Sequence, residues 1–149
     1  MKLSIITINF NRKTDLEATL ASAADQQFRD FEYIVIDGGS SDDSLVLLEE
    51  YQDIINYSVS EPDDGIFDAM NKGIQAATGE YLLFLNGGDT FLHSRSLADA
   101  MSYLQQATED IVYGDILVEM SYGGELRFRY PDQLNFRYFL EHDLPHQAT

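Results

Sequence analysis

An alternation of buried strands and amphipathic helices runs through the first 85 residues of the 149-residue chain. Residues 3–8 are apolar and β-branched, as in a strand buried on both faces, and three more runs read as strands: residues 31–36, 55–59 and 81–85. A helical pattern follows each of the first three runs. Because strands separated by helices pair in parallel through right-handed crossovers, the pattern predicts an α/β fold with a mainly parallel sheet.

The segments between the strands indicate where each helix begins and which face it buries. Thr14 and Glu17 have the spacing of a capping box, and Ser41, Asp42 and Asp43 precede the second helix. Inward-facing side chains are expected at helical spacing: Leu16, Leu20 and Ala24 in the first helix, Leu45, Leu48 and Tyr51 in the second, and Phe67, Met70, Ile74 and Ala77 in the third.

The second half of the chain shows a different order of elements. The elements expected there are a helix with Leu97, Met101 and Leu104 inward, a short fifth strand at 111–113, a hairpin of 116–120 with 126–130, and a short helix at 136–140. The chain ends at His146-Gln147-Ala148-Thr149 without a terminating signal. We therefore expect residues 1–149 to form a single domain that lacks a C-terminal, acceptor-side portion.

The charge and the missing cysteines exclude several kinds of partner. A net charge of −17 argues against nucleic acid as a partner and against adhesion to an anionic membrane surface. The chain has no cysteine, so it forms neither disulfides nor thiolate metal sites. No apolar run approaches the ~18 residues of a membrane span. An acidic chain can still bind an anionic cofactor when a divalent cation bridges the two.

The segment around residues 84–89 gives the clearest sign of a ligand site. A buried strand runs into Asn86-Gly87-Gly88-Asp89, a polar turn that ends in a carboxylate. Ligands of open α/β sheets bind beyond the carboxyl ends of the strands, and glycines let a phosphate approach the backbone. Asp89 is therefore placed to hold Mg²⁺ or Mn²⁺ against a diphosphate. Asn, Gly and Asp are also the usual residues of an ordinary turn, so this alternative stays open.

Four segments in register carry a resemblance to a known family: Ser4–Asn11, Ile34–Asp42, Asn71–Glu80 and Phe84–Asp89. In order, spacing and strand-end placement they resemble glycosyltransferase family 2, whose members are inverting GT-A enzymes that use nucleotide-sugar donors. The resemblance implies a Rossmann-like, three-layer GT-A fold. It also implies the transfer of a sugar, from a UDP-sugar in particular, to a glycan or a lipid-linked acceptor.

The resemblance implies roles for residues at the first two strand ends. Thr7, Asn9 and Asn11 would lie against the nucleoside, and Asp37 would lie beside the uracil or the ribose. In the commoner family pattern a second acid follows the first, and this chain has Gly38 at that position. This departure leaves the base contact, and with it the choice of nucleobase, open.

Other residues would touch the donor or the metal if the resemblance holds. The further substrate-binding candidates are Asp64, Lys72, Asn86 and His146, and Asp89 matches the last acid of the family's metal motif. For Asp64 and Lys72 a solvated surface position is an equally simple interpretation. Asp42, close to the same edge, also fits the role of a helix N-cap.

The reaction that the resemblance implies is a single displacement at the anomeric carbon. A metal stabilises the charge on the leaving diphosphate, and a carboxylate base takes the proton of the acceptor hydroxyl. In the family this base usually lies well downstream, so we expect it beyond Thr149. Asp115, after the expected fifth strand, is the candidate within the chain. Such enzymes often build polysaccharides at the cytoplasmic membrane face, which implies a cytoplasmic protein held there through partners or missing segments.

Two other classes of protein stay open. One is a nucleotide-binding module without transferase activity. The other is a different α/β enzyme, but a nucleotidyltransferase would need glycines around Arg12 and Lys13, and an Asp-nucleophile phosphotransferase would need an acid in place of Gly39. Neither requirement is met by the sequence.

Overall fold

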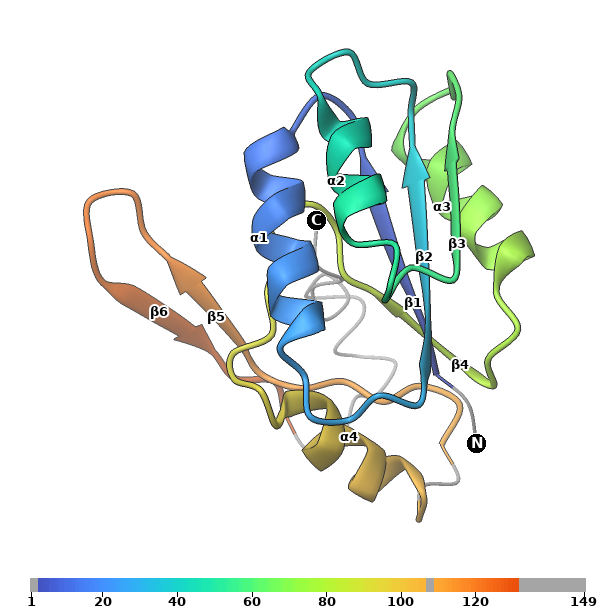
Figure 1. Ribbon diagram of the computed structural model, residues 1–149. Coiled ribbons are helices and arrows are strands. Elements are labelled where there is room, and N and C mark those ends of the chain that lie inside the picture. Colours follow the sequence, from blue (N-terminus) through green and yellow to red (C-terminus); the bar gives the residue numbers. More distant parts are fainter. Residues whose placement is uncertain (1–2, 107–108, 132–149) are drawn as a thin grey trace.

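The computed structural model describes residues 3–106 and 109–131 and has a parallel sheet at its centre (Figure 1). The sheet contains four parallel strands in the order β3-β2-β1-β4: β1 Leu3–Asn9, β2 Phe31–Asp37, β3 Tyr57–Ser60 and β4 Tyr81–Phe84. The expected mainly parallel sheet is therefore confirmed. The third strand lies further along the chain than expected, because the amide of Ile55 still donates to Tyr51 O in the turn that ends the preceding helix.

The central strand sets the level of the sheet's carboxyl edge. Every residue of β1 is buried. β1 pairs with β2 from Leu3 opposite Phe31 to Asn9 opposite Asp37, and with β4 on its other side. The chain first builds outward from β1 to β3 and then returns to place β4 on the opposite side of β1. The carboxyl ends of β1 and β4 therefore form the topological switch point, where ligands of open α/β sheets bind.

Helices cover both faces of the sheet, which gives the three layers expected from the sequence. Three helices cover one face: α1 Lys13–Ala24, α2 Ser44–Glu50 and α4 Ser96–Leu104. Their buried side chains, among them Leu16, Leu20 and Met101, pack with Ile5, Tyr33 and Val35 of the sheet. On the other face α3, Ile66–Ala76, packs Ala69 and Met70 against four isoleucines of the sheet: Ile6, Ile8, Ile34 and Ile36. Burial of these apolar side chains stabilises the sandwich.

The start of α1 is capped from outside the helix, so the capping box expected at Thr14 is wrong. The residue before α1 is Arg12, and it provides no side-chain cap. Instead, the amide of Lys13 donates to the Asp42 carboxylate at 2.8 Å. Asp42 also accepts hydrogen bonds from the amide and hydroxyl of Ser44 at the start of α2. These hydrogen bonds lower the pKa of Asp42, and the bond from the Ser44 hydroxyl has the largest effect. Desolvation of the carboxylate opposes them only in part. One carboxylate thus serves the N-termini of two helices.

The buried faces of α2 and α3 agree only in part with those that the spacing predicts. In α2, Leu48 and Tyr51 pack against the core as expected, but Leu45 is exposed and Leu47 is buried in its place. In α3 the expected inward residues Phe67 and Ile74 are exposed. The helix is turned so that Ala69, Met70 and Gly73 face the sheet. Only a residue without a Cβ lets the helix approach β1 so closely, since a Cβ on Gly73 would lie 2.4 Å from Ile6 Cγ2.

Gly73→Ala is expected to lower the free energy of unfolding by about 1–3 kcal/mol. The alanine gains about 1 kcal/mol in helix propensity, but overpacking against the fully buried Ile6 costs more. Urea unfolding followed by circular dichroism measures the difference. Gly114→Ala is the control, because a Cβ there meets nothing within 4 Å. A Gly73→Ala variant as stable as the parent would contradict the close packing of α3 on β1.

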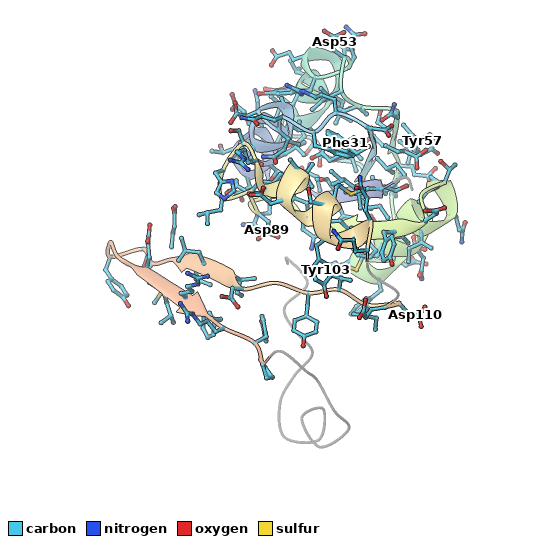
Figure 2. All side chains as sticks on the ribbon, turned by 90° about the horizontal axis from the view of Figure 1, so that it is seen from below. Phe31, Asp53, Tyr57, Asp89, Tyr103 and Asp110 are labelled. Atoms are coloured by element: carbon cyan, nitrogen blue, oxygen red, sulfur yellow. The ribbon has the colours of Figure 1, made fainter. Side chains whose placement is uncertain are left out.

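The second half of the described chain contains one packed helix and one separate hairpin. Leu97, Met101 and Leu104 of α4 are buried as expected. The expected hairpin is confirmed as β5, Ile116–Glu119, paired antiparallel with β6, Glu125–Phe128. It projects from the body of the molecule (Figures 1 and 2).

Its turn has Gly123 and Gly124 at positive φ angles of 82° and 106°, which side chains with a Cβ rarely adopt. The strand expected at 111–113 is absent from the described structure: Ile111 is 76% exposed and finds no strand to pair with. The helix expected at 136–140 lies outside the described residues. Within the described ranges, none of the helices has the length and apolar character that a bilayer crossing requires.

Candidate functional site

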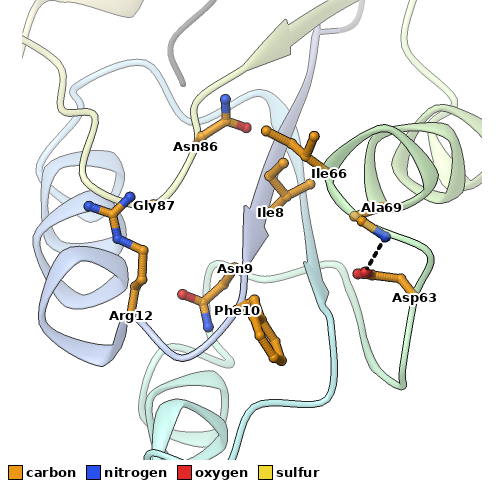
Figure 3. A pocket seen from close by; sticks show the side chains of 10 residues that line it. Ile8, Asn9, Phe10, Arg12, Asp63, Ile66, Ala69, Asn86 and Gly87 are labelled. Atoms are coloured by element: carbon orange, nitrogen blue, oxygen red, sulfur yellow. Dashed lines mark hydrogen bonds between the residues drawn. The ribbon is translucent and has the colours of Figure 1, made fainter.

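A pocket of about 230 Å³ opens at the switch point between the carboxyl ends of β1 and β4 (Figure 3). Its walls come from the end of β1, the loop after it, the turn after β4 and the start of α3. The lining residues are Ile8, Asn9, Phe10, Arg12, Asp63, Gly65, Ile66, Ala69, Asn86 and Gly87. Segments far apart in sequence thus meet where the topology predicts a ligand site.

Two asparagines supply buried polar groups to this pocket. Asn86 is 3% exposed, and neither its amide nitrogen nor its amide oxygen has a hydrogen-bond partner among the described residues. Asn9 donates from Nδ2 to Asp37 and Ser40, while its Oδ1 has no such partner. Buried polar atoms are nearly always satisfied, and leaving one without a partner costs about 1–3 kcal/mol. Both sequence candidates therefore lie in the pocket with hydrogen-bonding capacity left for a ligand.

The turn after β4 is held in place by α1. Thr19 Oγ1 accepts a hydrogen bond from the amide of Gly88 at 2.9 Å and lies 3.2 Å from Asn86 O. Gly88 has a φ of +104°, a conformation that a glycine adopts without strain. Asp89 follows at the end of this turn, half-buried, with its amide bonded to Asn86 O. Residues 86–89 thus form a fixed strand-end turn, with a carboxylate three residues from the pocket's asparagine.

The candidate metal ligands are few. Within residues 3–106 and 109–131, no three His, Cys, Asp or Glu side chains cluster closely enough to hold a metal ion by themselves. Asp89 and the amide oxygen of Asn86 are oxygen donors on the same turn. Such a set suits a hard divalent cation that takes its other ligands from water and from a phosphate, as Mg²⁺ usually does. It would not suit a cation that needs a complete protein cage.

Among the aromatic and charged side chains of the pocket lining, sequence reasoning missed Phe10, Arg12 and Asp63. Phe10 is 60% exposed and lies between the two asparagines that were expected at the site. Arg12 is the cationic side chain among the lining residues, and its Nε donates to Asp15 at 2.6 Å. Asp63 stands next to Asp64, the acid that the resemblance places at the donor. Each of the three lies next to, or one residue away from, a predicted site residue, and this position is the signal that could have identified it.

Thr7 does not lie against the pocket, so its expected nucleoside contact is wrong. Its side chain is fully buried, and its hydroxyl donates to Leu85 O at 2.6 Å. The buried Tyr33 hydroxyl, 2.9 Å away, therefore donates to Thr7 Oγ1. Burial raises the pKa of Tyr33, and the hydrogen bond with Thr7 opposes this only in part. The Thr7 side chain points into the layer that β1 shares with α1.

Asp37 was expected to face the cleft, and the structure corrects this. Its side chain is fully buried. The carboxylate accepts hydrogen bonds from Asn9 Nδ2, from the hydroxyls of Ser40 and Ser60, and from the amides of Gly39 and Ser40. Burial by itself would raise the pKa of Asp37, but these hydrogen bonds stabilise the charged form and leave the pKa below its usual value. Asp37 anchors the loop after β2.

Asp64 and Lys72 also lie elsewhere than expected. Asp64 is exposed and outside the pocket lining, while the preceding Asp63 lines it. Lys72 Nζ pairs with Glu61 at 2.9 Å and with Asp68 at 3.4 Å. The hydrogen bond with Glu61 is the main cause of a raised pKa of Lys72, so this side chain stays protonated. Its positive charge is therefore paired with the carboxylates of Glu61 and Asp68.

Asn11 joins two loops. Its backbone φ is +51°, its amide donates to Ser40 Oγ, and its side-chain oxygen accepts from the amide of Ser41. It therefore fixes the loop after β1 to the loop after β2, beside the pocket rather than in its lining. His146, the last expected substrate residue, lies outside the described residues.

Asp115 does not follow a strand of the central sheet, which corrects the expectation for a base. It precedes β5 of the separate hairpin. Its carboxylate accepts hydrogen bonds from Arg127 at 2.9 and 3.2 Å, and Arg129 lies 3.9 Å away. The hairpin arginines thus engage the Asp115 carboxylate, and Asp115 is not among the residues that line the pocket.

Comparison with known proteins shows what the whole chain is similar to. The family model for glycosyl transferase family 2 matches residues 4–147. An uncharacterised glycosyltransferase of Mycobacterium tuberculosis is 38% identical over 154 residues, which cover 99% of this chain and 57% of that protein. The chain thus spans little more than half the length of this curated relative.

A second relative and a solved structure extend the comparison. The GalNAc(5)-diNAcBac-PP-undecaprenol beta-1,3-glucosyltransferase of Campylobacter jejuni is 36% identical over 124 residues, which cover 79% of this chain and 39% of that protein. Among solved structures, TarS 1-349 of S. aureus in complex with UDP-GlcNAc matches with a TM-score of 0.64 and 28% identity. The match covers 71% of this chain and 32% of that one.

Proposed function

The chain belongs to glycosyltransferase family 2 and has a GT-A fold, and from this premise we propose that its pocket binds a UDP-sugar donor. The observation that carries the proposal is the buried Asn86 amide without a described partner, set at the switch point where such ligands bind. The UDP-GlcNAc bound by TarS supports this choice of donor. Residues 1–149 would then act as one donor-binding domain.

In this proposal different lining residues bind different parts of the donor. The asparagines Asn9 and Asn86 offer hydrogen bonds to the hydroxyl groups of the ribose or the sugar. Asp15 takes the Nε donor of Arg12, and the remaining N–H groups of this guanidinium would bind the diphosphate, whose charge an otherwise acidic chain has to balance. The exposed Phe10 ring offers an apolar face at the mouth of the pocket.

A divalent cation fits the donor set on the turn after β4. Asp89 and Asn86 would hold it, with water and the diphosphate completing its coordination. When bound, such a cation stabilises the negative charge that develops on the leaving diphosphate. The chain's own contribution is to fix the turn that carries both residues, through the hydrogen bonds of Thr19 with Asn86 O and the Gly88 amide.

The proposed reaction transfers the sugar to a glycan or a lipid-linked acceptor with inversion. The relative from Campylobacter jejuni, whose name contains an undecaprenol-linked glycan, supports an acceptor of this kind. Such an acceptor would bring the protein to the cytoplasmic face of the membrane. We assign no general base among the described residues, because Asp115 is paired with arginines.

Asn86→Ala is expected to weaken UDP binding about tenfold and to leave the melting temperature unchanged. The side chain makes no described hydrogen bond within the protein, so its loss removes ligand contacts and no structural ones. A tenfold change corresponds to about 1.4 kcal/mol, the size of one or two hydrogen bonds. Isothermal titration with UDP and MnCl₂ measures the affinity, and thermal melting measures the fold.

Asp64→Ala serves as the matched control, since Asp64 is exposed and outside the pocket lining. Unchanged UDP affinity in Asn86→Ala, or a lowered melting temperature, would contradict the assignment. A UDP-release assay with several acceptors separates a transferase from a module that only binds the nucleotide. Binding without release by the natural full-length protein would favour the binding module.

A further inference from the structure

A carboxylate and an aromatic ring meet over Gly38, at the end of β2. A Cβ placed on Gly38 would lie 2.7 Å from Asp63 Oδ2 and 3.3 Å from Phe10 Cδ2. The space that any side chain at position 38 would fill is therefore taken by Asp63, from the loop after β3, and by the edge of Phe10. Both residues line the pocket (Figure 3).

The Asp63 carboxylate is fixed at one oxygen and open at the other. Its Oδ1 accepts a hydrogen bond from the amide of Gly65 at 2.9 Å, just before α3 begins. Within the described ranges this is the one hydrogen bond that the carboxylate accepts, and no Lys, Arg or His lies within ion-pair distance of it. Oδ2, directed toward Gly38, thus keeps its capacity to accept a hydrogen bond.

Phe10 adds a stacking surface beside this acceptor. Its ring is 60% exposed although it lies at the pocket, and its edge rests against Gly38. Exposed aromatic faces bind nucleobases by stacking, and every base has a face that suits this contact. When a base stacks on such a ring, a charged acceptor at the edge of the ring distinguishes two kinds of base. It accepts a hydrogen bond from a base with an N–H donor in its plane and repels a base with a lone pair at that position.

We propose that Asp63 and Phe10 read the nucleobase of the donor, with the ring stacking on the base and Asp63 Oδ2 accepting its ring imino N–H. This proposal rests on the nucleotide-sugar function proposed above. Uracil and guanine carry an imino N–H on the ring edge, whereas cytosine and adenine carry a lone pair there. A carboxylate oxygen aligned with this ring nitrogen gains a hydrogen bond from uracil or guanine and faces the lone pair of cytosine or adenine, whose amino hydrogens lie to one side of it. This alignment selects uracil or guanine nucleotides over cytosine and adenine nucleotides.

Gly38 is the condition for this arrangement. A methyl group at position 38 would push against Asp63 Oδ2, which is 2.7 Å from that position. The glycine's φ lies outside the left-handed region, so the backbone itself accepts an alanine. Gly38→Ala is therefore expected to reduce the preference for UDP over CDP in the same direction as a change at Asp63.

The test is a competition titration of the full chain with UDP, GDP, CDP and ADP at a fixed MnCl₂ concentration. The parent is expected to bind UDP or GDP at least about tenfold more tightly than CDP and ADP, as a charge-assisted hydrogen bond gained in place of a repulsion implies. In Asp63→Asn the amide can rotate to donate to cytosine, so the ratio of UDP to CDP affinity is expected to fall about 10- to 100-fold.

Two further variants separate reading of the base from loss of the fold. Asp64→Asn changes the neighbouring exposed acid and is expected to keep the parent's ratios. Phe10→Leu is expected to weaken all four nucleotides together, since stacking is common to them. Equal affinity of the parent for the four nucleotides, or an unchanged ratio in Asp63→Asn with an intact melting curve, overturns the inference and leaves the donor pocket standing. No binding of any of the four overturns the proposed function as well.

Discussion

Asp37→Ala is expected to lower the free energy of unfolding by about 3–5 kcal/mol. The carboxylate is fully buried and accepts hydrogen bonds from Asn9, Ser40, Ser60 and the loop amides that follow it. Each buried donor that loses its acceptor costs about 1–3 kcal/mol, and water entering the loop offsets only part of the sum. Urea unfolding measures the change, with Asp64→Ala as the control for loss of an exposed acid.

The same network sets how stability depends on pH. The pKa of Asp37 lies below its unfolded value of about 3.9, so its contribution is complete above about pH 4 and is lost as the pH falls through the lower, folded pKa. Asp37→Asn is expected to flatten this part of the stability curve. An Asp37→Ala protein as stable as the parent, with weaker nucleotide binding, would instead return Asp37 to the ligand site.

Asp89→Ala is expected to remove the gain in UDP affinity that Mn²⁺ or Mg²⁺ provides. In the parent we expect binding about 100-fold tighter with the metal than with a chelator, since loss of even indirect metal contacts costs about 10- to 100-fold in metal affinity. In the variant the two affinities should coincide. Isothermal titration with MnCl₂ and with EDTA gives both values.

Asp99→Ala, which changes an exposed acid on α4, is the control for a general effect of charge. Its metal dependence should equal that of the parent. A parent protein whose UDP affinity is the same with metal and with EDTA would contradict the metal assignment. A metal-dependent gain that survives Asp89→Ala would move the metal to other ligands.

The layers of the fold and the position of the site can both be predicted from patterns in the sequence. Apolar runs separated by helices require a parallel sheet, and parallel strands bring their polar ends to one edge. Asn9 and Asn86 follow two such runs, and the structure places both in one pocket. The glycine pair of the hairpin turn is equally explicit, because its positive φ angles favour glycine.

The facing of individual side chains was harder to predict, because a strand buried on both faces carries no alternation. Thr7 and Asp37 both stand near the ends of such strands, and both point into buried hydrogen-bond networks. A polar residue at the end of such a strand can be buried with hydrogen-bond partners from the protein, or it can face a ligand. The sequence pattern is the same in both cases. The hydrogen-bond partners of Asp37 come from three segments of the chain, so the sequence around Asp37 does not identify them.

Other misplacements have equally specific causes. The face of α3 is turned by the close approach of Gly73 to Ile6, which spacing alone does not encode. Asp63 and Asp64 are adjacent loop acids, and only the space left at Gly38 distinguishes them. Asp115 was misplaced because its arginine partners lie across a hairpin from it. In each case a residue distant in sequence decides the outcome.

The central claim, that a nucleoside diphosphate and its metal bind at the β1/β4 switch point, is tested most directly by paramagnetic broadening in ¹H–¹⁵N NMR spectra. Substoichiometric Mn²⁺ is added to the labelled chain with saturating UDP, and the amides that lose intensity mark the metal's surroundings. The account predicts loss at residues 86–89 and at the loop after β1, with the hairpin and the far end of the sheet unaffected. Broadening centred elsewhere, or identical spectra with and without UDP, would contradict it.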